Sequence, residues 1–262
     1  MSRIKIEFSN LFQLFIFAGK TPEDHSFSEF APSKFIKQFK DKNLDILATA
    51  EMLIDDSDGN SQYVEMFSKE LNLPYYKTFV NEKSWVFEGK YYGMTIFSKF
   101  PIKNYEIFNL PNPKLEVDRP NGDHWIMHDK SAQKVTFEVD GQLLDLFNLH
   151  YFPVHHFNKR IDDPELHNIK EELLRILSGS NNSTIITGDF NNKGVVFDKA
   201  FPELVEGNKF KESLIVDTTL YGGKDQLDHI LYDPSKLSLI KSSREESLSD
   251  HYALYAEFDL SI

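Results

Sequence analysis

The alternation of apolar and polar residues along the chain predicts many short strands and few helices. Apolar side chains alternate with polar ones over residues 4–8, and residues 44–50 form an apolar run that ends at Glu51. Similar runs, bounded by turn-forming residues, predict strands at residues 77–80, 84–87, 92–97, 102–108, 124–127, 133–139, 143–149, 184–187, 213–218, 227–232, 237–241 and 252–258.

Three segments space their apolar residues as helices do. Pro32 interrupts the first, so a helix is expected from about Ser33 to Lys40, and the second covers residues 62–71. The third, residues 163–177, has Asp163 as N-cap and Pro164 in its first turn. The apolar run at residues 11–17 is too short to span a bilayer and predicts a buried helix or loop.

The connections between most predicted strands are as short as hairpins. A parallel sheet would need a helix between nearly every pair of strands. The pattern therefore predicts an α/β fold in which two mixed sheets pack face to face with helices outside. Because no stretch resembles a linker or a repeat, residues 1–262 are expected to form a single domain.

Composition narrows the chemistry. The absence of cysteine excludes disulfides, thiolate metal sites and a cysteine nucleophile, and leaves the oxygen and imidazole ligands that suit Mg²⁺, Mn²⁺ or Ca²⁺. The net charge of -12 argues against tight passive binding of nucleic acid, but less against an enzyme whose metal supplies positive charge. No signal-peptide layout or transmembrane-length segment is seen, so a cytoplasmic location is expected.

Polar residues recur where predicted strands end, and packing alone would not require them there. Asp189 and Asn191 are two residues apart, so an extended segment turns both to one side. Asp250 and His251 are neighbours that point apart, and Asp228 could orient the His251 imidazole. Singly, each residue also has a structural explanation, such as an exposed acid, a packed histidine or a turn. The candidates are Asn10, Glu51, His150, Asp189, Asn191, Asp228, Asp250 and His251.

The ordered set of motifs resembles the endonuclease/exonuclease/phosphatase superfamily, which has the DNase I-like fold. The resemblance covers nearly the whole chain. One departure is Ala50, where the family commonly has glutamine before the glutamate. The motifs are the first strand with Asn10, residues 45–51 with Glu51, residues 93–102, Asn148-Leu149-His150, Gly188-Asp189-Phe190-Asn191, residues 227–231 with Asp228, and Ser249-Asp250-His251.

The resemblance implies a four-layer α/β sandwich with the site at one end of both sheets. It assigns a divalent cation, Mg²⁺ or alternatively Mn²⁺ or Ca²⁺, to Asn10, Glu51 and Asp250. The catalytic residues that it implies are His150, Asp189, Asn191, Asp228 and His251.

The resemblance also implies a role for each catalytic residue. Asp189 and Asn191 would position the attacking water and the phosphate. His251, oriented by Asp228, would act as general base or as a charge stabiliser. His150 would contact the phosphate or assist the leaving oxygen.

Three function hypotheses follow from this reading. The leading one is a metal-dependent phosphodiesterase acting on nucleic acid, as an endonuclease or exonuclease, through metal-assisted attack of water on phosphorus. The second is a phosphatase or phosphodiesterase of a phosphoinositide, sphingomyelin or other small phosphate ester, which the net negative charge keeps open. The third and least favoured is a catalytically silent binding module.

Substrate choice in such a scaffold is expected to lie in its loops. The expected specificity regions are residues 81–92, 111–130, 151–163 and 192–211. Aromatic and cationic residues there, such as Arg119, Trp125, Lys130 and His156, could stack on bases and contact phosphates. The alternative is that they anchor loops or carry solvated charge.

Overall fold

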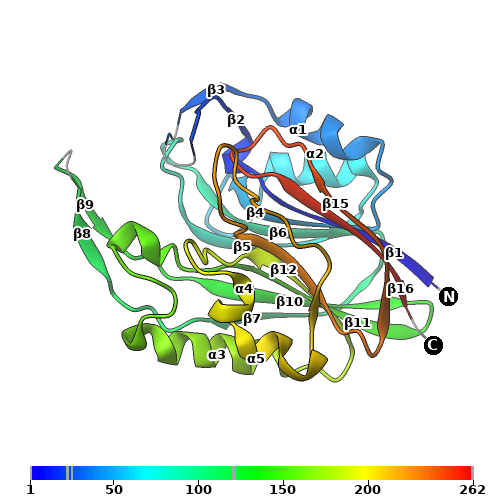
Figure 1. The fold of residues 1–262 in the computed structure, drawn as a ribbon. Helices are drawn as coiled ribbons and strands as arrows, with labels where there is room; N and C mark the ends of the chain where they lie inside the picture. Colours follow the sequence, from blue (N-terminus) through cyan, green and yellow to red (C-terminus); the bar gives the residue numbers. More distant parts are fainter. Residues whose placement is uncertain (1, 22–23, 25, 120–121, 261–262) are drawn as a thin grey trace.

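Two six-stranded sheets form the centre of the molecule, and the computed structural model describes residues 2–21, 24, 26–119 and 122–260 (Figure 1). The first sheet has the order β15 (Leu237–Glu245), β16 (Ala253–Leu260), β1 (Ser2–Asn10), β4 (Ile46–Ile54), β6 (Tyr91–Ser98) and β5 (Tyr75–Lys83). The second has the order β13 (Lys211–Glu212), β14 (Asp228–Tyr232), β12 (Ser183–Asp189), β11 (Gln142–His150), β10 (Ser131–Val139) and β7 (Ile102–Asn109).

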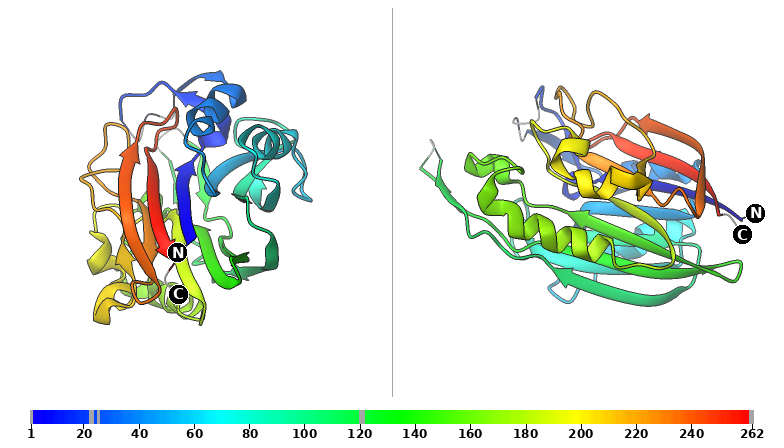
Figure 2. Two further views of the ribbon diagram at one scale, coloured as in Figure 1. Left: turned by 90° about the vertical axis from the view of Figure 1, so that its right-hand side faces the viewer. Right: turned by 60° about the horizontal axis from the view of Figure 1, so that its bottom comes forward.

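Helices cover the outer face of each sheet (Figure 2). The first sheet carries α1 (Pro32–Lys40) and α2 (Gln62–Leu71), and the second carries α3 (His167–Leu177), α4 (Phe197–Ala200) and α5 (Pro202–Val205). Between the sheets lies a third apolar cluster, to which β1 contributes Ile4, Ile6 and Phe8. The predicted four-layer α/β sandwich is therefore confirmed. No helix within the described residues has both the length and the apolar character needed to cross a membrane.

Each sheet has one parallel pair of strands at its centre. These pairs are β1 with β4 and β11 with β12, and every other pairing in the two sheets is antiparallel. Parallel strands end at the same edge of a sheet. The antiparallel neighbours β16 and β14 begin at that same edge. Consequently, one end of the molecule, away from the chain termini, collects the ends of β1, β4, β11 and β12 and the starts of β14 and β16 (Figure 1).

Two predicted strands are wrong for local reasons. Residues 84–87 form a turn, because the Ser84 hydroxyl accepts hydrogen bonds from the backbone N–H groups of Val86 and Phe87. Only β13 forms near residues 213–218. There the side chain of Gln226 binds Val216 N and Leu214 O, so a side chain takes the place of a strand partner.

The helix boundaries also differ from the expectation. Residues Phe27–Phe30 form β3, which pairs with β2 (Phe15–Phe17), and α1 begins at Pro32. A turn, η3 (Pro164–Leu166), precedes α3, because the Asp163 carboxylate accepts from Arg160 N instead of capping the helix. Other short elements are η1 (Phe12–Leu14), η2 (Val154–Phe157), η4 (Glu206–Asn208) and the hairpin of β8 (Glu116–Asp118) and β9 (His124–Ile126).

A buried amide joins the two sheets next to their converging ends. Asn148 in β11 donates from Nδ2 to the backbone oxygen of Thr49 in β4, at 3.0 Å. Its Oδ1 accepts from the Thr187 hydroxyl, at 3.1 Å. Thr49 lies just before a β-bulge, where the pairing of β4 with β6 shifts between Thr49 and Met52. Asn148 therefore fixes the position of this bulge relative to the second sheet.

Replacing Asn148 with alanine is expected to lower the free energy of unfolding by about 2–4 kcal/mol, because the Thr49 carbonyl and the Thr187 hydroxyl lose a buried partner. Urea denaturation measures the change. The matched control is Asn104→Ala, because Asn104 is exposed, and that change should stay within about 0.5 kcal/mol. Equal effects of the two substitutions would contradict the proposed joining role.

Candidate active site

The converging strand ends bring together the residues that the sequence singled out. The parallel pair β1 and β4 carries Asn10 and Glu51, and the pair β11 and β12 ends in His150 and Asp189. Asp228 is the first residue of β14, and His251 lies two residues before β16, at an isolated bridge to Leu220. These residues come together because each lies at the edge where the parallel strands of its sheet end.

Glu51 owes its position to the β-bulge. Its backbone has φ 52°, in the left-handed region, while β4 continues beyond it to Ile54. Asn10 Nδ2 donates to Glu51 Oε1 at 3.2 Å, and Asn10 Oδ1 accepts from Phe12 N at 3.1 Å. Burial and the nearby Asp250 carboxylate raise the pKa of Glu51 from 4.5 to about 7. Burial and a neighbouring carboxylate destabilise the negative charge of Glu51, so a cation that binds beside it would be stabilising.

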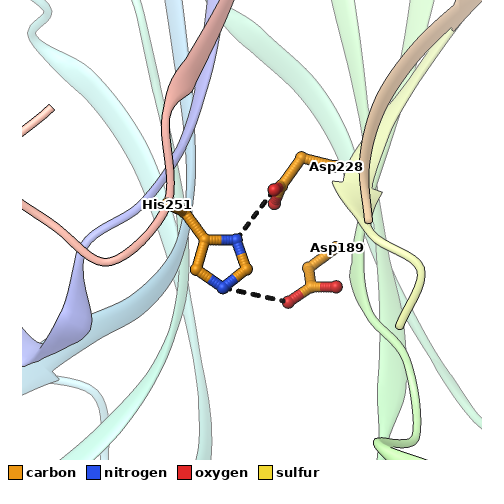
Figure 3. A group of neighbouring side chains, drawn as sticks. All are labelled: Asp189, Asp228 and His251. Carbon is orange, nitrogen blue, oxygen red and sulfur yellow. Dashed lines mark hydrogen bonds and ion pairs between the residues drawn. The ribbon is translucent and has the colours of Figure 1, made fainter. Parts of the chain in front are cut away.

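On the other side of the site, His251 lies between two carboxylates (Figure 3). Its Nδ1 lies 2.7 Å from Asp228 Oδ2, and its Nε2 lies 4.0 Å from Asp189 Oδ2. The Thr219 hydroxyl accepts from the backbone N–H groups of Leu227 and Asp228, which fixes the start of β14. The imidazole is therefore oriented by Asp228 and presents Nε2 toward Asp189.

The two histidines of the site differ in charge. Burial tends to lower the pKa of His251, but Asp228, Asp250 and Asp189 outweigh it and raise that pKa well above 6.5. Burial and the cations Lys130 and His251 hold the pKa of His150 well below 6.5. The imidazolium form of His251 and the neutral form of His150 are therefore favoured at pH 7.

Asp189 faces both of these histidines. Its Oδ2 lies 3.8 Å from His150 Nε2, which in turn lies 4.0 Å from Glu51 Oε1. Burial and the Asp228 carboxylate raise the pKa of Asp189 to about 8, against the opposing effect of His251. A carboxyl group with a pKa near neutrality can accept and release a proton at working pH.

Asn191 holds the turn that follows Asp189. Its backbone N donates to Asp189 Oδ1 at 2.9 Å, and its Nδ2 donates to the backbone oxygen of Tyr151 at 3.0 Å. Its φ of 50° lies in the left-handed region, which asparagine tolerates. One N–H of the amide is thus engaged with the protein, so only the other can meet a phosphate. The predicted role of Asn191 stays a prediction.

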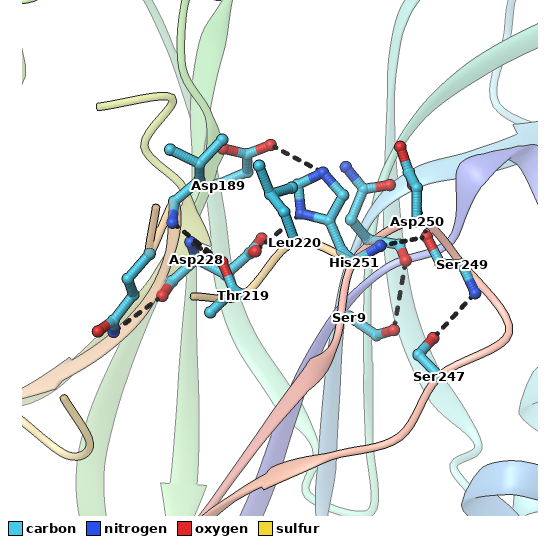
Figure 4. Close-up of polar contacts among 12 residues, drawn as sticks. Ser9, Asp189, Thr219, Leu220, Asp228, Ser247, Ser249, Asp250 and His251 are labelled. Carbon is cyan, nitrogen blue, oxygen red and sulfur yellow. Dashed lines mark hydrogen bonds and ion pairs between the residues drawn. The ribbon is translucent and has the colours of Figure 1, made fainter. Parts of the chain in front are cut away.

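Asp250 lies next to Ser249 and His251 (Figure 4). The Ser249 hydroxyl donates to Asp250 Oδ1 at 2.9 Å and accepts from His251 N at 3.3 Å. Its negative charge contributes to the raised pKa of both Glu51 and His251. The eight predicted residues thus form one connected site, whereas their metal-binding and catalytic roles stay predictions.

Lys130 belongs to this site, although the sequence analysis counted it among the cations of a loop. It is buried just before β10, and burial lowers its pKa against the attraction of Glu82, Glu51 and Asp189. No local pattern distinguishes it from the other lysines, because its neighbours in space come from β4, β5 and β12. The one available signal was its position three residues before the strand predicted at residues 133–139.

Two groups of side chains could hold a metal ion. The ligand atoms of Asp189, Asp228 and His251 lie within 4.8 Å of one another. However, a protonated His251 whose Nδ1 is bound to Asp228 has no lone pair to offer a metal. Asn10, Glu51 and Asp250 supply only oxygen donors, which suit Mg²⁺. The donor chemistry therefore fits a divalent cation at Glu51 better than at His251.

A model of the endonuclease/exonuclease/phosphatase family matches residues 28–251. The chain belongs to this family. The resemblance inferred from the sequence motifs is thereby confirmed. Members of the family are phosphoester hydrolases, so this edge of the two sheets is where such chemistry is expected. No curated protein matches the chain.

Solved structures of the family share this fold. An endonuclease/exonuclease/phosphatase from Beutenbergia cavernae has a TM-score of 0.71 and 14% identity, covering 99% of this chain and 72% of its own. For ANGEL2, described as a 2′,3′-cyclic phosphatase, the TM-score is 0.62 with 14% identity, over 99% and 96% of the chains. A mannosyl-6-phosphatase from Bacteroides thetaiotaomicron has a TM-score of 0.59 and 15% identity, over 98% and 100%.

Proposed function

We propose that this family member is a divalent-metal-dependent phosphodiesterase that hydrolyses nucleic acid. The observation that carries the proposal is the Asp189 carboxyl group, placed between an imidazolium and a neutral imidazole and opposite Glu51. That arrangement suits hydrolysis of an anionic ester, because it combines a proton acceptor with cationic and neutral donors. ANGEL2, a neighbour in fold, is described in complex with adenosine-2′,3′-vanadate, which supports a nucleotide substrate.

The residues suited to hold the cation are Asn10, Glu51 and Asp250. A bound Mg²⁺ ion would neutralise charge that develops on the phosphate oxygens. Manganese and calcium ions, which also prefer oxygen ligands, are the alternatives. We also propose that residues 1–262 act as one domain, because both sheets contribute to the site.

In the proposed reaction, Asp189 accepts the proton of the attacking water. Its raised pKa makes its ionised form, which is the minor form at pH 7, a stronger base than an ordinary aspartate. His251 donates its Nε2–H to a phosphate oxygen, and Asp228 stabilises the imidazolium. His150 donates a neutral hydrogen bond to the phosphate or the leaving oxygen. Lys130 supplies positive charge among the carboxylates, and Asn191 holds Asp189 in place.

A substrate panel tests the proposal. Purified protein is incubated with supercoiled plasmid, single-stranded DNA, RNA, a phosphoinositide, sphingomyelin and sugar phosphates, each with Mg²⁺ and with EDTA. We expect hydrolysis of at least one nucleic acid, lost in EDTA and reduced about 10³-fold in Asp189→Asn. Activity that persists in EDTA would exclude the metal mechanism, and an intact set of nucleic acids would exclude the nuclease assignment.

The second candidate is hydrolysis of a small phosphate ester. It is favoured by the net charge of -12, which repels a polyanion, and by the fold similarity to a mannosyl-6-phosphatase. The same panel separates the two, because a small-ester enzyme would release phosphate from a sugar phosphate or a lipid headgroup and leave polymers intact. Binding without turnover of any ester would instead indicate a silent binding module.

A further inference from the structure

Aromatic rings from three distant parts of the chain gather beside the site. Phe12 contacts Phe17 at 6.0 Å and Trp85 at 5.8 Å between ring centroids, and Phe17 lies 6.4 Å from Tyr221. We call these four residues, Phe12, Phe17, Trp85 and Tyr221, the aromatic rim. Catalysis as proposed above uses none of them.

The rim is continuous with the predicted metal ligands. The backbone N–H of Phe12 donates to Asn10 Oδ1, and that of Tyr221 donates to the backbone oxygen of Asp250 at 2.8 Å. The strand β2, which contains Phe17, lies at the end of the molecule where the strand ends converge (Figure 1). A group bound on the rim would therefore lie next to a phosphate held at Glu51.

Trp85 and Tyr221 present much of their surface to solvent. Trp85 is 51% exposed and Tyr221 is 40% exposed, whereas Phe12 is only 3% exposed and supports the others from below. Isolated apolar side chains are common on protein surfaces, but a row of packed rings with exposed ends is a feature of binding surfaces.

Hydrogen bonds hold the Trp85 loop in one conformation. The Ser84 hydroxyl donates to Oε1 of the buried Gln13 at 2.6 Å and accepts from the backbone N–H groups that follow Trp85. Gln13 itself lies in a run from Phe12 to Leu14 whose three φ angles are all positive. Backbone of this kind costs energy and persists where its surroundings hold it. The rim is thus built in advance of any ligand, which reduces the entropy lost on binding.

Charge decides which partner fits the rim. Tyr221 is bonded through its backbone to Asp250, and its hydroxyl donates to Glu246 at 3.4 Å. The net charge of -12 of the whole chain disfavours binding a long track of phosphates. A flat, uncharged ring is not repelled, and bases stack on aromatic side chains whatever their sequence.

We propose that the aromatic rim stacks an unpaired base next to the scissile phosphate, so that the protein acts on single-stranded nucleic acid. This inference rests on the proposed nuclease function. In a duplex the base faces are covered by their neighbours, so a stacking platform selects unpaired strands. Affinity for the strand then comes from stacking on the rings and from the metal site. An acidic protein can therefore bind a polyanion without a basic surface.

The test separates base contacts from backbone contacts. Two substrates are compared: a single-stranded oligonucleotide of whichever nucleic acid the protein hydrolyses, and a strand of equal length in which every nucleotide is abasic. The variants are Trp85→Ala and Tyr221→Ala. Tyr221→Phe keeps the ring, and Tyr75→Ala is the control, because Tyr75 is 42% exposed at the start of β5, away from the strand ends.

For the natural strand, we expect kcat/KM to fall roughly 5- to 100-fold in each alanine variant and to be unchanged in Tyr221→Phe and Tyr75→Ala. On the abasic strand, the wild-type protein should already be at least as slow as the variants are on the natural strand, and the variants should lose nothing more. Addition of the complementary strand should slow the wild-type protein by a similar factor.

Other outcomes would contradict either base stacking on the rim or the nuclease function, and the two can be told apart. Equal losses on both strands would show that the rim only supports the fold, and no loss on either would show that bases do not bind there. Both results would leave the nuclease function intact. If the wild-type protein cleaves neither strand, the nuclease function itself fails. If the alanine variants lose activity only on a sugar phosphate from the substrate panel, the rim packs against a sugar.

Discussion

Replacing His251 with glutamine is expected to lower kcat for phosphodiester hydrolysis by about 10³-fold, measured under saturating Mg²⁺. The expectation rests on the imidazolium, which lies within 4.0 Å of Asp189 and is the cation best placed to stabilise charge on a phosphate oxygen. Glutamine keeps a donor but loses the positive charge. A loss below tenfold would mean that His251 is a structural residue.

Two controls accompany this experiment. His167→Gln alters an exposed histidine on α3 that pairs with Glu171, and it should leave kcat unchanged. Circular dichroism reports the folded fraction of His251→Gln. This measurement is needed because removing a buried cation leaves Asp228 and Asp250 without a nearby counter-charge. The rate is then expressed per folded molecule, so that lost stability is not mistaken for lost catalysis.

Asp228→Asn tests the positioning of His251 by a different readout. The Asp228 carboxylate raises the pKa of His251, so its loss should lower that pKa. Since the proposed donor is the imidazolium, the alkaline limb of the pH–rate profile should move to lower pH. A variant that loses rate with an unshifted profile would show that Asp228 acts on the fold alone.

Glu51→Gln is expected to weaken Mn²⁺ or Mg²⁺ binding at least about 100-fold. Loss of a group that merely orients a ligand costs 10- to 100-fold, and loss of a charged ligand itself should cost no less. Isothermal titration calorimetry measures the affinity without reference to activity. Asp56→Asn is the control, because Asp56 is an acid on the loop that follows β4 and no metal role is proposed for it. Unchanged affinity in Glu51→Gln would place the cation elsewhere.

The same substitution should stabilise the metal-free protein at pH 8. The pKa of Glu51 is raised to about 7 in the folded state, from 4.5, so the folded protein binds this proton more tightly than the unfolded chain does. The stability contributed at low pH is therefore lost as pH rises from about 4.5 to 7, at about 1.4 kcal/mol per pKa unit. Glutamine avoids this loss. Thermal melting in EDTA should show a higher Tm for Glu51→Gln than for wild type at pH 8, and a smaller difference at pH 5.

The sequence located most of the polar strand ends of the site because they are local features. An apolar run followed by an abrupt polar residue marks such an end wherever it occurs, and the motifs around Asp189 and His251 follow this rule. The order of the motifs was enough to infer the sandwich and the family, both of which are confirmed.

The sequence misled where side-chain contacts, one of them from far along the chain, replace the pairing that the local pattern predicts. Ser84 and Gln226 bind backbone groups that a strand partner would otherwise bind, so two predicted strands do not form. Glu51 was expected beyond the end of its strand, but a β-bulge carries β4 past it and turns its backbone to positive φ. That bulge is held by Asn148, 99 residues away in the chain.

By itself, the sequence determined which residues could do chemistry, since residue type and position at a strand end are properties of a short stretch. The protonation states of the site histidines were decided by the tertiary structure alone. His150 and His251 are the same residue type, yet one is held neutral and the other protonated by neighbours that folding places around them. Burial of Lys130 and assembly of the aromatic rim depend in the same way on strands and loops far apart in the chain. Protonation and packing act through space, so only the folded chain could decide them.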